Sequence, residues 1–286
     1  MSGKILKQLI GKKRILRMPG ASNPFVAMLI EQAGFDGVYI SGAGLANSLG
    51  LPDDGSLKLE DFVYFASFIT RAVNIPVICD ADTGLDMGEK DSIQQTVKAF
   101  IQSGLAGLHI EDQVFPKRCG HLEGKEVVER EVMLERIRQS VQARDQSDRN
   151  FQVIARTDAR GAGNLSESRQ LEECVERGIA YARAGADMIF PESLRSLDEF
   201  RLFRSRLDVP LVANMTEFGR TPLLTAEQFE QLGYNIVIYP VSLFRYAAGH
   251  TKAALEIIKR DGNQQQLIKG MMTRDQINEL LGYKPE

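Results

Sequence analysis

Short apolar runs alternate with longer amphipathic stretches along the whole chain, and this alternation restricts the fold more than any other feature. The runs are β-prone and apolar on both faces, as strands buried inside a parallel sheet are. Eight such runs occur, at residues 15–18, 38–40, 77–79, 107–110, 153–155, 188–190, 211–213 and 236–239. Helical spacing marks the amphipathic stretches at residues 59–73, 91–102, 131–144 and 167–184. Strands that alternate with helices in this way predict a closed α/β barrel of the (β/α)₈ TIM type.

The length of the chain agrees with one such barrel. A chain of 286 residues is close to the roughly 250 residues that α/β barrels commonly use. The main alternative is an open doubly wound sheet, which usually has fewer strands and a phosphate-binding glycine turn. The glycines at 42–44 lack the third glycine of that motif, because Asn47 stands at its position. We therefore expect residues 1–286 to form a single barrel domain, with residues 264–286 as a carboxyl-terminal helical extension.

Composition and charge argue against several classes of function. Hydrophobic residues make up 43% and charged residues 26%, as in an ordinary globular protein. The net charge is −3, so the chain lacks the excess of basic residues that would indicate nucleic-acid binding. No apolar run is long enough to cross a membrane, and the amino terminus reads as an amphipathic surface helix rather than a secretory signal. The cysteines, Cys79, Cys119 and Cys174, are too few and too scattered for a disulfide framework. We expect a cytoplasmic protein that binds neither nucleic acid nor membrane.

One loop combines a thiol with positive charge. Residues 115–121 read Phe-Pro-Lys-Arg-Cys-Gly-His, so Cys119 lies close to two cations and His121. Nearby positive charge makes a thiol reactive at neutral pH. The loop also follows soon after the apolar run 107–110 and the acid Glu111. An acid at a strand end followed by a reactive thiol predicts an active site. The alternative is a solvated basic loop with an incidental cysteine.

Polar residues follow most of the expected strands at their carboxyl ends. In barrel enzymes these ends form one face, and the chemistry takes place there. The polar groups at these positions are Tyr39, Ser41, Asp80, Asp82, Glu111, Asp112, Arg156, Thr157, Asp158, Glu192, Asn214 and Thr216. If the barrel forms, they converge on one mouth. This convergence indicates an active site more strongly than any single motif does.

Acids among these residues predict a metal site. Asp80 and Asp82 alternate at a strand end and should point to the same side, while Glu111 ends the next strand. Like charges this close are unfavourable without a cation, and oxygen ligands favour Mg²⁺ or Mn²⁺ over zinc. The alternative for Asp80 and Asp82 is turn chemistry or helix capping. Asp53 is either a remote acid that reaches the metal through water or a turn residue, and its spacing alone favours the turn.

Arg156 lies inside an apolar run, where an arginine is costly unless it is paired. It can clamp a substrate carboxylate, or it can pair with Glu192 or Glu111, and the two roles are compatible. A hard cation next to such donors suits an oxygen-rich anion such as an α-hydroxy acid, whose hydroxyl the metal would activate. Cys119 then serves as a proton donor or a base rather than necessarily as a nucleophile. His109, inside a strand, is expected to be a hydrogen-bonded core residue.

The motifs together resemble the isocitrate lyase and phosphoenolpyruvate mutase superfamily. The most specific of them is Lys117-Arg118-Cys119-Gly120-His121. The likeness extends over nearly the whole chain, through the segments 39–44, 49–53, 80–84, 107–113, 155–158, 190–192 and 213–219. This resemblance implies a carbon–carbon lyase that cleaves 2-methylisocitrate to pyruvate and succinate by retro-aldol chemistry, in the methylcitrate cycle of propionate catabolism.

The resemblance also implies a role for each site residue. Mg²⁺ would be held directly by Asp80, and mainly through water by Asp82, Asp53 and Glu111. The end of the substrate that becomes pyruvate would be bound by Ser41, Gly42 and Ala43. The succinate side and the loop contacts would be formed by Lys117, Arg118, Gly120, His121, Glu192, Asn214 and Thr216. Arg156 would clamp a carboxylate, Cys119 would protonate the carbanion-like succinate, and Tyr39 is a candidate for removing the hydroxyl proton.

The resemblance further implies a barrel whose last helix is exchanged between subunits, giving a homotetramer of two helix-swapped dimers. Two positions depart from the family pattern. Ala43 stands where glycine is usual, and its small methyl group should leave main-chain binding intact. Residues 122–125 differ from the expected loop, and this departure concerns substrate choice.

Related activities are the alternatives to this reading. They are a lyase acting on isocitrate or 2,3-dimethylmalate, a phosphonomutase-type isomerase, and a binding protein on the same scaffold. The binding protein would be expected to lack part of the metal and thiol set, all of which is present. Isocitrate lyases tend to carry tryptophan where Phe190 stands, so the smaller ring here leaves room for an extra methyl group. One methyl group is worth only about 1–3 kcal/mol of discrimination.

Overall fold

The strands form where the apolar runs predict them. The structure is a computed structural model that describes residues 2–12, 14–85, 91–118, 120–121 and 124–284. Its strands are β1 (Leu16–Pro19), β2 (Val38–Ile40), β3 (Val77–Asp80), β4 (Gly107–Glu111), β5 (Gln152–Thr157), β6 (Met188–Pro191), β7 (Val212–Asn214) and β8 (Ile236–Tyr239). Each begins and ends within two residues of its expected position, because a short run that is apolar on both faces suits a strand covered on both sides.

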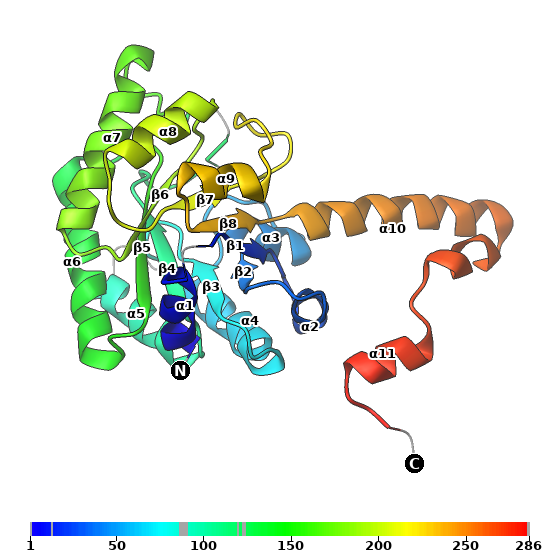
Figure 1. The fold of residues 1–286 in the computed structure, drawn as a ribbon. Helices are drawn as coiled ribbons and strands as arrows, with labels where there is room; N and C mark the ends of the chain where they lie inside the picture. Colours follow the sequence, from blue (N-terminus) through cyan, green and yellow to red (C-terminus); the bar gives the residue numbers. More distant parts are fainter. Residues whose placement is uncertain (1, 13, 86–90, 119, 122–123, 285–286) are drawn as a thin grey trace.

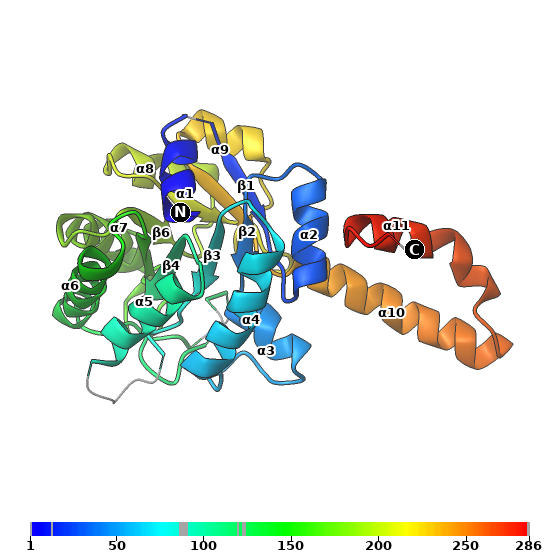
Figure 2. The same cartoon turned by 90° about the horizontal axis from the view of Figure 1, so that it is seen from below.

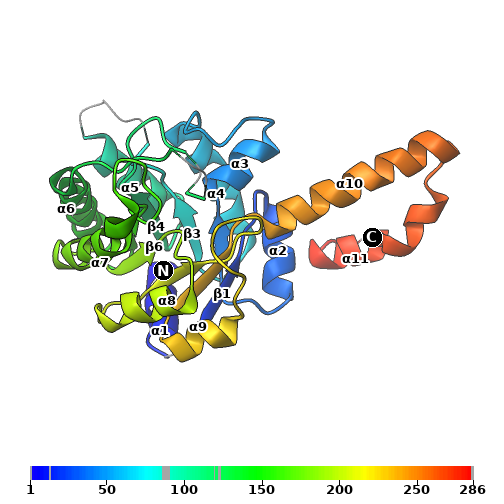
Figure 3. The same cartoon turned by 90° about the horizontal axis from the view of Figure 1, so that it is seen from above.

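The strands are parallel and close into a barrel. β2 to β6 pair in chain order, and β1, β8 and β7 pair as a second group. Parallel bridges from Gly20 to Tyr39 and from Ile189 to Leu211 join the two groups at their seams. On its other side, beyond the pairing of β1 with β8, Gly20 approaches the main chain so closely that a Cβ would lie 1.9 Å from the Pro240 carbonyl oxygen. The (β/α)₈ barrel expected from the sequence is confirmed (Figure 3).

Helices cover the outside of the barrel (Figure 1). They are α2 (Pro24–Gln32), α3 (Gly42–Ser48), α4 (Leu59–Ala72), α5 (Ser92–Gln102), α6 (Arg130–Ser147), α7 (Glu167–Arg183), α8 (Leu197–Ser205) and α9 (Ala226–Leu232). Several starts are fixed by caps, because Asn23, Ser196 and Thr225 accept hydrogen bonds from first-turn amides of α2, α8 and α9. Apolar residues of the helices pack on the strands from outside, and this layer contains the larger of the two buried clusters.

The inside of the barrel is closed at one end by the amino-terminal helix, α1 (Ser2–Ile10). Interior side chains such as Ile78 and Ile238 form one cluster, and Leu6 of α1 belongs to it with no exposed surface. A Cβ on Gly3 would lie 2.4 Å from the carbonyl oxygen of Asn150, which precedes β5. The amphipathic surface helix expected from the sequence is confirmed, because α1 packs one face against the amino-terminal end of the barrel (Figure 2) and exposes Lys4, Lys7 and Gln8 on the other. The opposite end, where the strands finish, stays available for a site.

The carboxyl-terminal part leaves the barrel. The described residues of α10 (Ser242–Asp261), the 3₁₀ turn η1 (Gln265–Gly270) and α11 (Arg274–Leu280) include no buried one. α10 extends away from the strands in Figure 1, Figure 2 and Figure 3, and α11 returns to contact α2. The departure thus begins before residue 264, where the sequence placed the extension. None of the described helices is both long and apolar enough to span a bilayer.

Candidate active site

A polar pocket opens at the carboxyl ends of the strands. The residues that line it are Tyr39, Ser41, Ala43, Asp53, Asp80, Lys117, Arg118, Gly120, His121, Arg156, Phe190, Glu192, Asn214, Thr216, Pro240, Val241 and Arg245. Most of the candidate residues are therefore brought to one place. Gly42, Asp82 and Glu111 contact lining residues without lining the pocket themselves. Cys119 lies outside the described residues.

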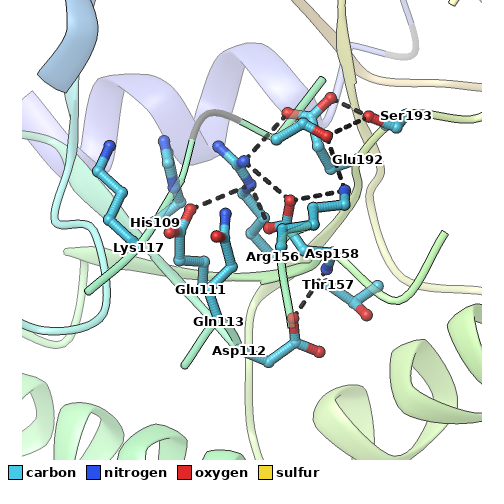
Figure 4. Close-up of polar contacts among 12 residues, drawn as sticks. His109, Glu111, Asp112, Gln113, Lys117, Arg156, Thr157, Asp158, Glu192 and Ser193 are labelled. Carbon is cyan, nitrogen blue, oxygen red and sulfur yellow. Dashed lines mark hydrogen bonds and ion pairs between the residues drawn. The ribbon is translucent and has the colours of Figure 1, made fainter. Parts of the chain in front are cut away.

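Arg156, on β5, is the centre of a buried network (Figure 4). Its Nε and Nη2 donate to the two oxygens of Asp158 at 2.8 and 3.1 Å. Nε also lies 3.3 Å from Glu111 Oε2, and Nη2 lies 3.5 Å from Glu192 Oε2. Burial opposes the charge, but Asp158 and Glu111 outweigh it and raise the pKa of Arg156 well above its ordinary value. The guanidinium is therefore charged and fixed in orientation. Its partners are Glu111 and Glu192, which the sequence suggested, and also Asp158.

Glu192 follows β6 and connects the loop after β4 to β7. Its carboxylate lies 2.9 Å from His121 Nε2, and Asn214 Nδ2 donates to it at 3.1 Å. The other imidazole nitrogen, Nδ1, accepts the main-chain amide of Arg220 at 3.1 Å. Burial alone would raise the pKa of Glu192, but Arg156 and then His121 hold it well below its ordinary value. Glu192 is therefore an anion at neutral pH and fixes the imidazole from one side.

The loop after β4 is held at its base and against the network. Gln113 is buried, and its side chain bonds the main chain of Arg118 twice, accepting from the amide at 2.9 Å and donating to the carbonyl at 2.8 Å. An antiparallel bridge between Gln113 and Val127 closes the base of the loop. Gly120 passes directly over Arg156, where a Cβ would lie 2.3 Å from Nη2. The close approach of the main chain requires glycine at this position.

The carboxylates that follow β3 lie around a lysine. Lys117 Nζ is 2.7 Å from Asp82 Oδ1 and also pairs with Asp53, which makes Asp53 part of the site and not only a turn residue. Asp80 accepts the amides of Gly42 at 3.2 Å and of Asp82 at 2.9 Å. Burial raises the pKa of Asp82 to about 6 against the opposing effect of Lys117. Burial also opposes the charge on Lys117, but Asp82 and Asp80 raise the pKa of the lysine well above its ordinary value.

Glu111, at the end of β4, is buried and incompletely paired. Burial raises its pKa well above the ordinary value, although Arg156 opposes the rise. Its Oε1 has no hydrogen-bond partner among the described residues. Within the described part of the chain, no three His, Cys, Asp or Glu side chains converge closely enough to hold a metal ion directly. The four acids that the sequence predicted as metal ligands therefore do not form one compact cluster. Asp53, Asp80 and Asp82 surround Lys117, and Glu111 pairs with Arg156.

Tyr39 and His109 form a buried pair between β2 and β4. The tyrosine hydroxyl lies 2.6 Å from His109 Nε2, and the rings stack with centroids 5.7 Å apart. Burial, with help from Arg156, lowers the pKa of His109 to about 3, so the imidazole is neutral. Burial, reinforced by Asp80, raises the pKa of Tyr39 well above its ordinary value. His109 is a hydrogen-bonded core residue as expected, and an un-ionised Tyr39 is a hydrogen-bonding group rather than a ready base.

The sequence did not indicate two cations of the site. Lys125 is 1% exposed, and its Nζ donates to the Gly120 carbonyl at 2.7 Å and to Asp158 at 3.0 Å. Arg245, near the start of α10, lines the pocket and donates to the Thr216 hydroxyl at 3.3 Å. A lysine in a polar loop carries no signal of burial, and Arg245 lies beyond the strand ends. Both become visible only when the loop and α10 are placed in three dimensions.

Comparison with known proteins decides the family. Residues 6–259 match the family described as phosphoenolpyruvate phosphomutase. The chain belongs to this family. A 2-methylisocitrate lyase of Aeropyrum pernix is 45% identical over 281 residues, which cover 98% of this chain and 87% of that protein.

Solved structures agree with this assignment. A 2,3-dimethylmalate lyase has 34% identity and a TM-score of 0.88, covering 99% of this chain and 92% of that one. A phosphonopyruvate hydrolase in complex with oxalate and Mg²⁺ has 32% identity and a TM-score of 0.86, covering 99% and 95% respectively. The resemblance drawn from the sequence is confirmed. The chain is an enzyme, a carbon–carbon lyase of the superfamily that contains phosphoenolpyruvate mutase and isocitrate lyase.

Proposed function

We propose that this lyase cleaves 2-methylisocitrate to pyruvate and succinate in a Mg²⁺-dependent retro-aldol reaction. The observation that carries the proposal is the composition of the pocket, whose lining combines the carboxylates of Asp53 and Asp80 with the cations of Lys117 and Arg156. A hydroxylated tricarboxylate needs both kinds of group. A metal held by carboxylates suits its hydroxyl and neighbouring carboxylate, and fixed cationic side chains suit the remaining carboxylates.

The acids near β3 and β4 suit a hard cation. Asp80 would hold Mg²⁺ directly, and Asp82, Asp53 and Glu111 would act mainly through water, with Mn²⁺ as an alternative metal. All these donors are oxygens, the pKa values of Asp82 and Glu111 are raised by burial, and Glu111 Oε1 lacks a partner among the described residues. Such acids are short of positive charge, which a cation would supply. When bound, Mg²⁺ would lower the pKa of the substrate hydroxyl and stabilise the charge that develops on oxygen.

The remaining lining residues bind and orient the substrate. Residues Ser41, Gly42 and Ala43 would bind the end that becomes pyruvate, and Arg156 would clamp a carboxylate. The succinate side would meet Lys117, Arg118, Gly120, His121, Glu192, Asn214 and Thr216. The support for this assignment is that all of these except Gly42 line one pocket, and that Gly42 donates its amide to Asp80 within it.

The reaction needs one group that accepts a proton and one that donates it. The hydroxyl proton leaves to a base, the carbon–carbon bond breaks to give pyruvate, and the electron pair stays on the carbon that becomes succinate. Cys119 would donate the proton that this carbon takes up. Tyr39 is the candidate for the first transfer. Its raised pKa keeps the hydroxyl un-ionised, and a bound cation such as Mg²⁺ would lower that pKa, whereas the carboxylates of the substrate would not.

Phe190 supports a methylated substrate. It lines the pocket, with Arg156 over its ring at 5.3 Å and His109 against its edge at 5.4 Å. The ring is therefore fixed, and it leaves more room than a tryptophan would. Cleavage of isocitrate or 2,3-dimethylmalate is the alternative, because a single methyl group discriminates by only about 1–3 kcal/mol. The similarity to a 2,3-dimethylmalate lyase keeps that acid as the second candidate. A phosphonomutase-type reaction is less favoured.

We also propose that the functional unit is a homotetramer of two helix-swapped dimers, each subunit being one barrel domain with a carboxyl-terminal extension. Support comes from α10, which has no buried residue although Leu243, Tyr246, Leu255 and Ile258 are exposed along it. A helix with so much exposed apolar surface would be covered in an assembly. The methylcitrate cycle would place this enzyme in the cytoplasm.

The test is a comparison of three acids with purified protein and Mg²⁺. 2-Methylisocitrate, isocitrate and 2,3-dimethylmalate are incubated separately, and the keto-acid products are identified by mass spectrometry. We expect pyruvate from 2-methylisocitrate, formed much faster than any product of the other two acids. Addition of a chelator and the variant Cys119→Ala should each abolish it, whereas Cys174→Ala, a thiol buried in α7, should retain it. Turnover of another acid alone, or of none, would contradict the proposed substrate.

A further inference from the structure

Lys125 is a buried cation to which the proposed reaction gives no role. Lysines are almost never fully buried without a partner, because removing an ammonium from water is costly. Here Nζ donates to the Gly120 carbonyl at 2.7 Å and to Asp158 Oδ1 at 3.0 Å. Asp158 in turn holds the guanidinium of Arg156 through both of its oxygens. One ammonium group thus ties the main chain of the loop to the arginine network.

The same carbonyl is held from a second direction. The hydroxyl of Ser193, in the segment between β6 and α8, donates to the Gly120 oxygen at 2.7 Å. Ser193 has a φ of +61°, which is unfavourable for a residue with a side chain, and its amide donates to Glu192 at 2.8 Å. Gly120 is therefore fixed between two donors from different parts of the chain. One of them is charged and belongs to the loop itself.

The main chain at Lys125 is held in place by hydrogen bonds. Its own carbonyl accepts the Gly163 amide at 2.7 Å. Two residues further on, the main chain of Val127 pairs with the side chain of Asn164 in both directions, at 3.2 and 2.8 Å. The backbone at Lys125 is thus anchored to the segment after β5, and the ammonium reaches back from there to Gly120.

We propose that Lys125 is a positioning residue of the active site, which fixes the Gly120 carbonyl against Asp158 and so sets the path of the main chain into His121. His121 follows Gly120 directly, and its imidazole lies 2.9 Å from Glu192, so the position of the carbonyl determines where the imidazole lies. The inference rests on the proposed function, because it assigns a role within the same site.

The variant Lys125→Met tests this role. Methionine keeps the length of the side chain and removes the ammonium, so Asp158 stays paired with Arg156 while Gly120 loses one of its two donors. We expect kcat to fall roughly tenfold to a hundredfold, as displacements of about 1 Å in a catalytic site do, with less than about a threefold change in KM. Hydrogen–deuterium exchange of the peptide covering residues 114–128 should become faster, and exchange in β1 and β8 should not change. Lys98→Met, at an exposed lysine of α5, is the matched control.

Ser193→Gly provides a second variant, at a hydroxyl that also lies 3.4 Å from His121 Nδ1. It removes the other donor to the same oxygen, and glycine suits the positive φ, so folding should be preserved even if Lys125→Met proves unstable. Its kcat and its local exchange should change in the same direction as those of Lys125→Met. If both variants match Lys98→Met in kcat and in exchange at 114–128, the positioning role is wrong. A uniform rise in exchange over the whole barrel would also overturn it, since that indicates a general structural role. Failure of the wild type to cleave 2-methylisocitrate would count against the proposed function alone, because exchange reports on Lys125 without turnover.

Discussion

Two of the three cysteines of this chain, Cys79 and Cys174, are buried thiols. Cys79 and Cys174 have no exposed surface, and burial raises the pKa of each thiol well above its ordinary value. Because the thiolate is the reactive form, neither should react near neutral pH. We expect brief treatment of the folded protein with iodoacetamide to label Cys119 alone, as read by peptide mass mapping. Unfolding in guanidinium should expose the other two, and their labelling before unfolding would contradict the prediction.

Burial also makes the stability of the protein depend on pH through His109. The folded pKa is about 3, whereas an unfolded histidine titrates near 6.5. Between these values the unfolded chain binds a proton that the folded chain does not, so stability falls as the pH drops below about 6.5, by at most about 1.4 kcal/mol per pH unit. His109→Gln lacks this effect. The free energy of unfolding of the wild type and of His109→Gln is measured in urea at both pH values. The difference by which the wild type exceeds the variant should be about 1.4 kcal/mol smaller at pH 5.5 than at pH 7.5. A difference that does not vary with pH would be the opposite result.

At the residue scale, the sequence predicted the ion-pair partners of a charged residue on a strand, but it did not predict the burial of a charged residue in a loop. Arg156 stood out because an arginine in an apolar run needs acids around it, and Glu111 and Glu192 were the acids at neighbouring strand ends. Lys125 did not stand out, since a lysine among polar loop residues is most simply solvated. Its burial follows from the return of the loop onto Asp158, which depends on contacts between segments far apart in the sequence.

At the scale of elements, the loop after β4 depends on a close approach of main chain to side chain. A Cβ at Gly120 would lie 2.3 Å from Arg156 Nη2, a group that ion pairs hold in place. Gly120→Ala must therefore displace the loop or the guanidinium, and we expect kcat/KM to fall about a hundredfold. Gly163→Ala is a matched control in the segment that supports the same loop, because the nearest atom to its Cβ would be at an ordinary 3.6 Å. In steady-state kinetics, Gly120→Ala should have a much lower kcat/KM than Gly163→Ala. Equal values would show that the close approach at Gly120 does not require glycine.

The elements of the barrel were predictable because each strand carries its own signal. A run such as 77–79, apolar on both faces, suits a buried parallel strand whatever its neighbours are. α10 had no comparable signal, since helical periodicity reports only that a face is apolar and not what covers it. The sequence therefore placed the extension at 264–286, whereas the chain leaves the barrel at α10 (Ser242–Asp261).

At the scale of the whole molecule, the exposed face of α10 predicts an assembly. Leu255 and Ile258 are 61% and 41% exposed, on a helix with no buried residue. We expect the wild type to sediment as a multiple of its 31.8 kDa chain mass, and the double variant Leu255→Glu/Ile258→Glu to sediment as a smaller species, because charged residues oppose burial of that face. Lys252→Glu, on the same helix, should leave the mass unchanged. A wild type that sediments as a monomer at assay concentration would rule out the tetramer.

Leu6 of α1 packs among interior side chains that include Ile236 and Ile238 of β8. During synthesis the amino terminus leaves the ribosome first, but the surroundings of Leu6 are incomplete until β8 has been made. α1, which precedes all eight strands, is therefore among the last of the described helices to reach its native contacts. Until β8 has been made, the apolar face of α1 has no complete barrel to enter, so it can be bound by chaperones during most of the synthesis of the barrel.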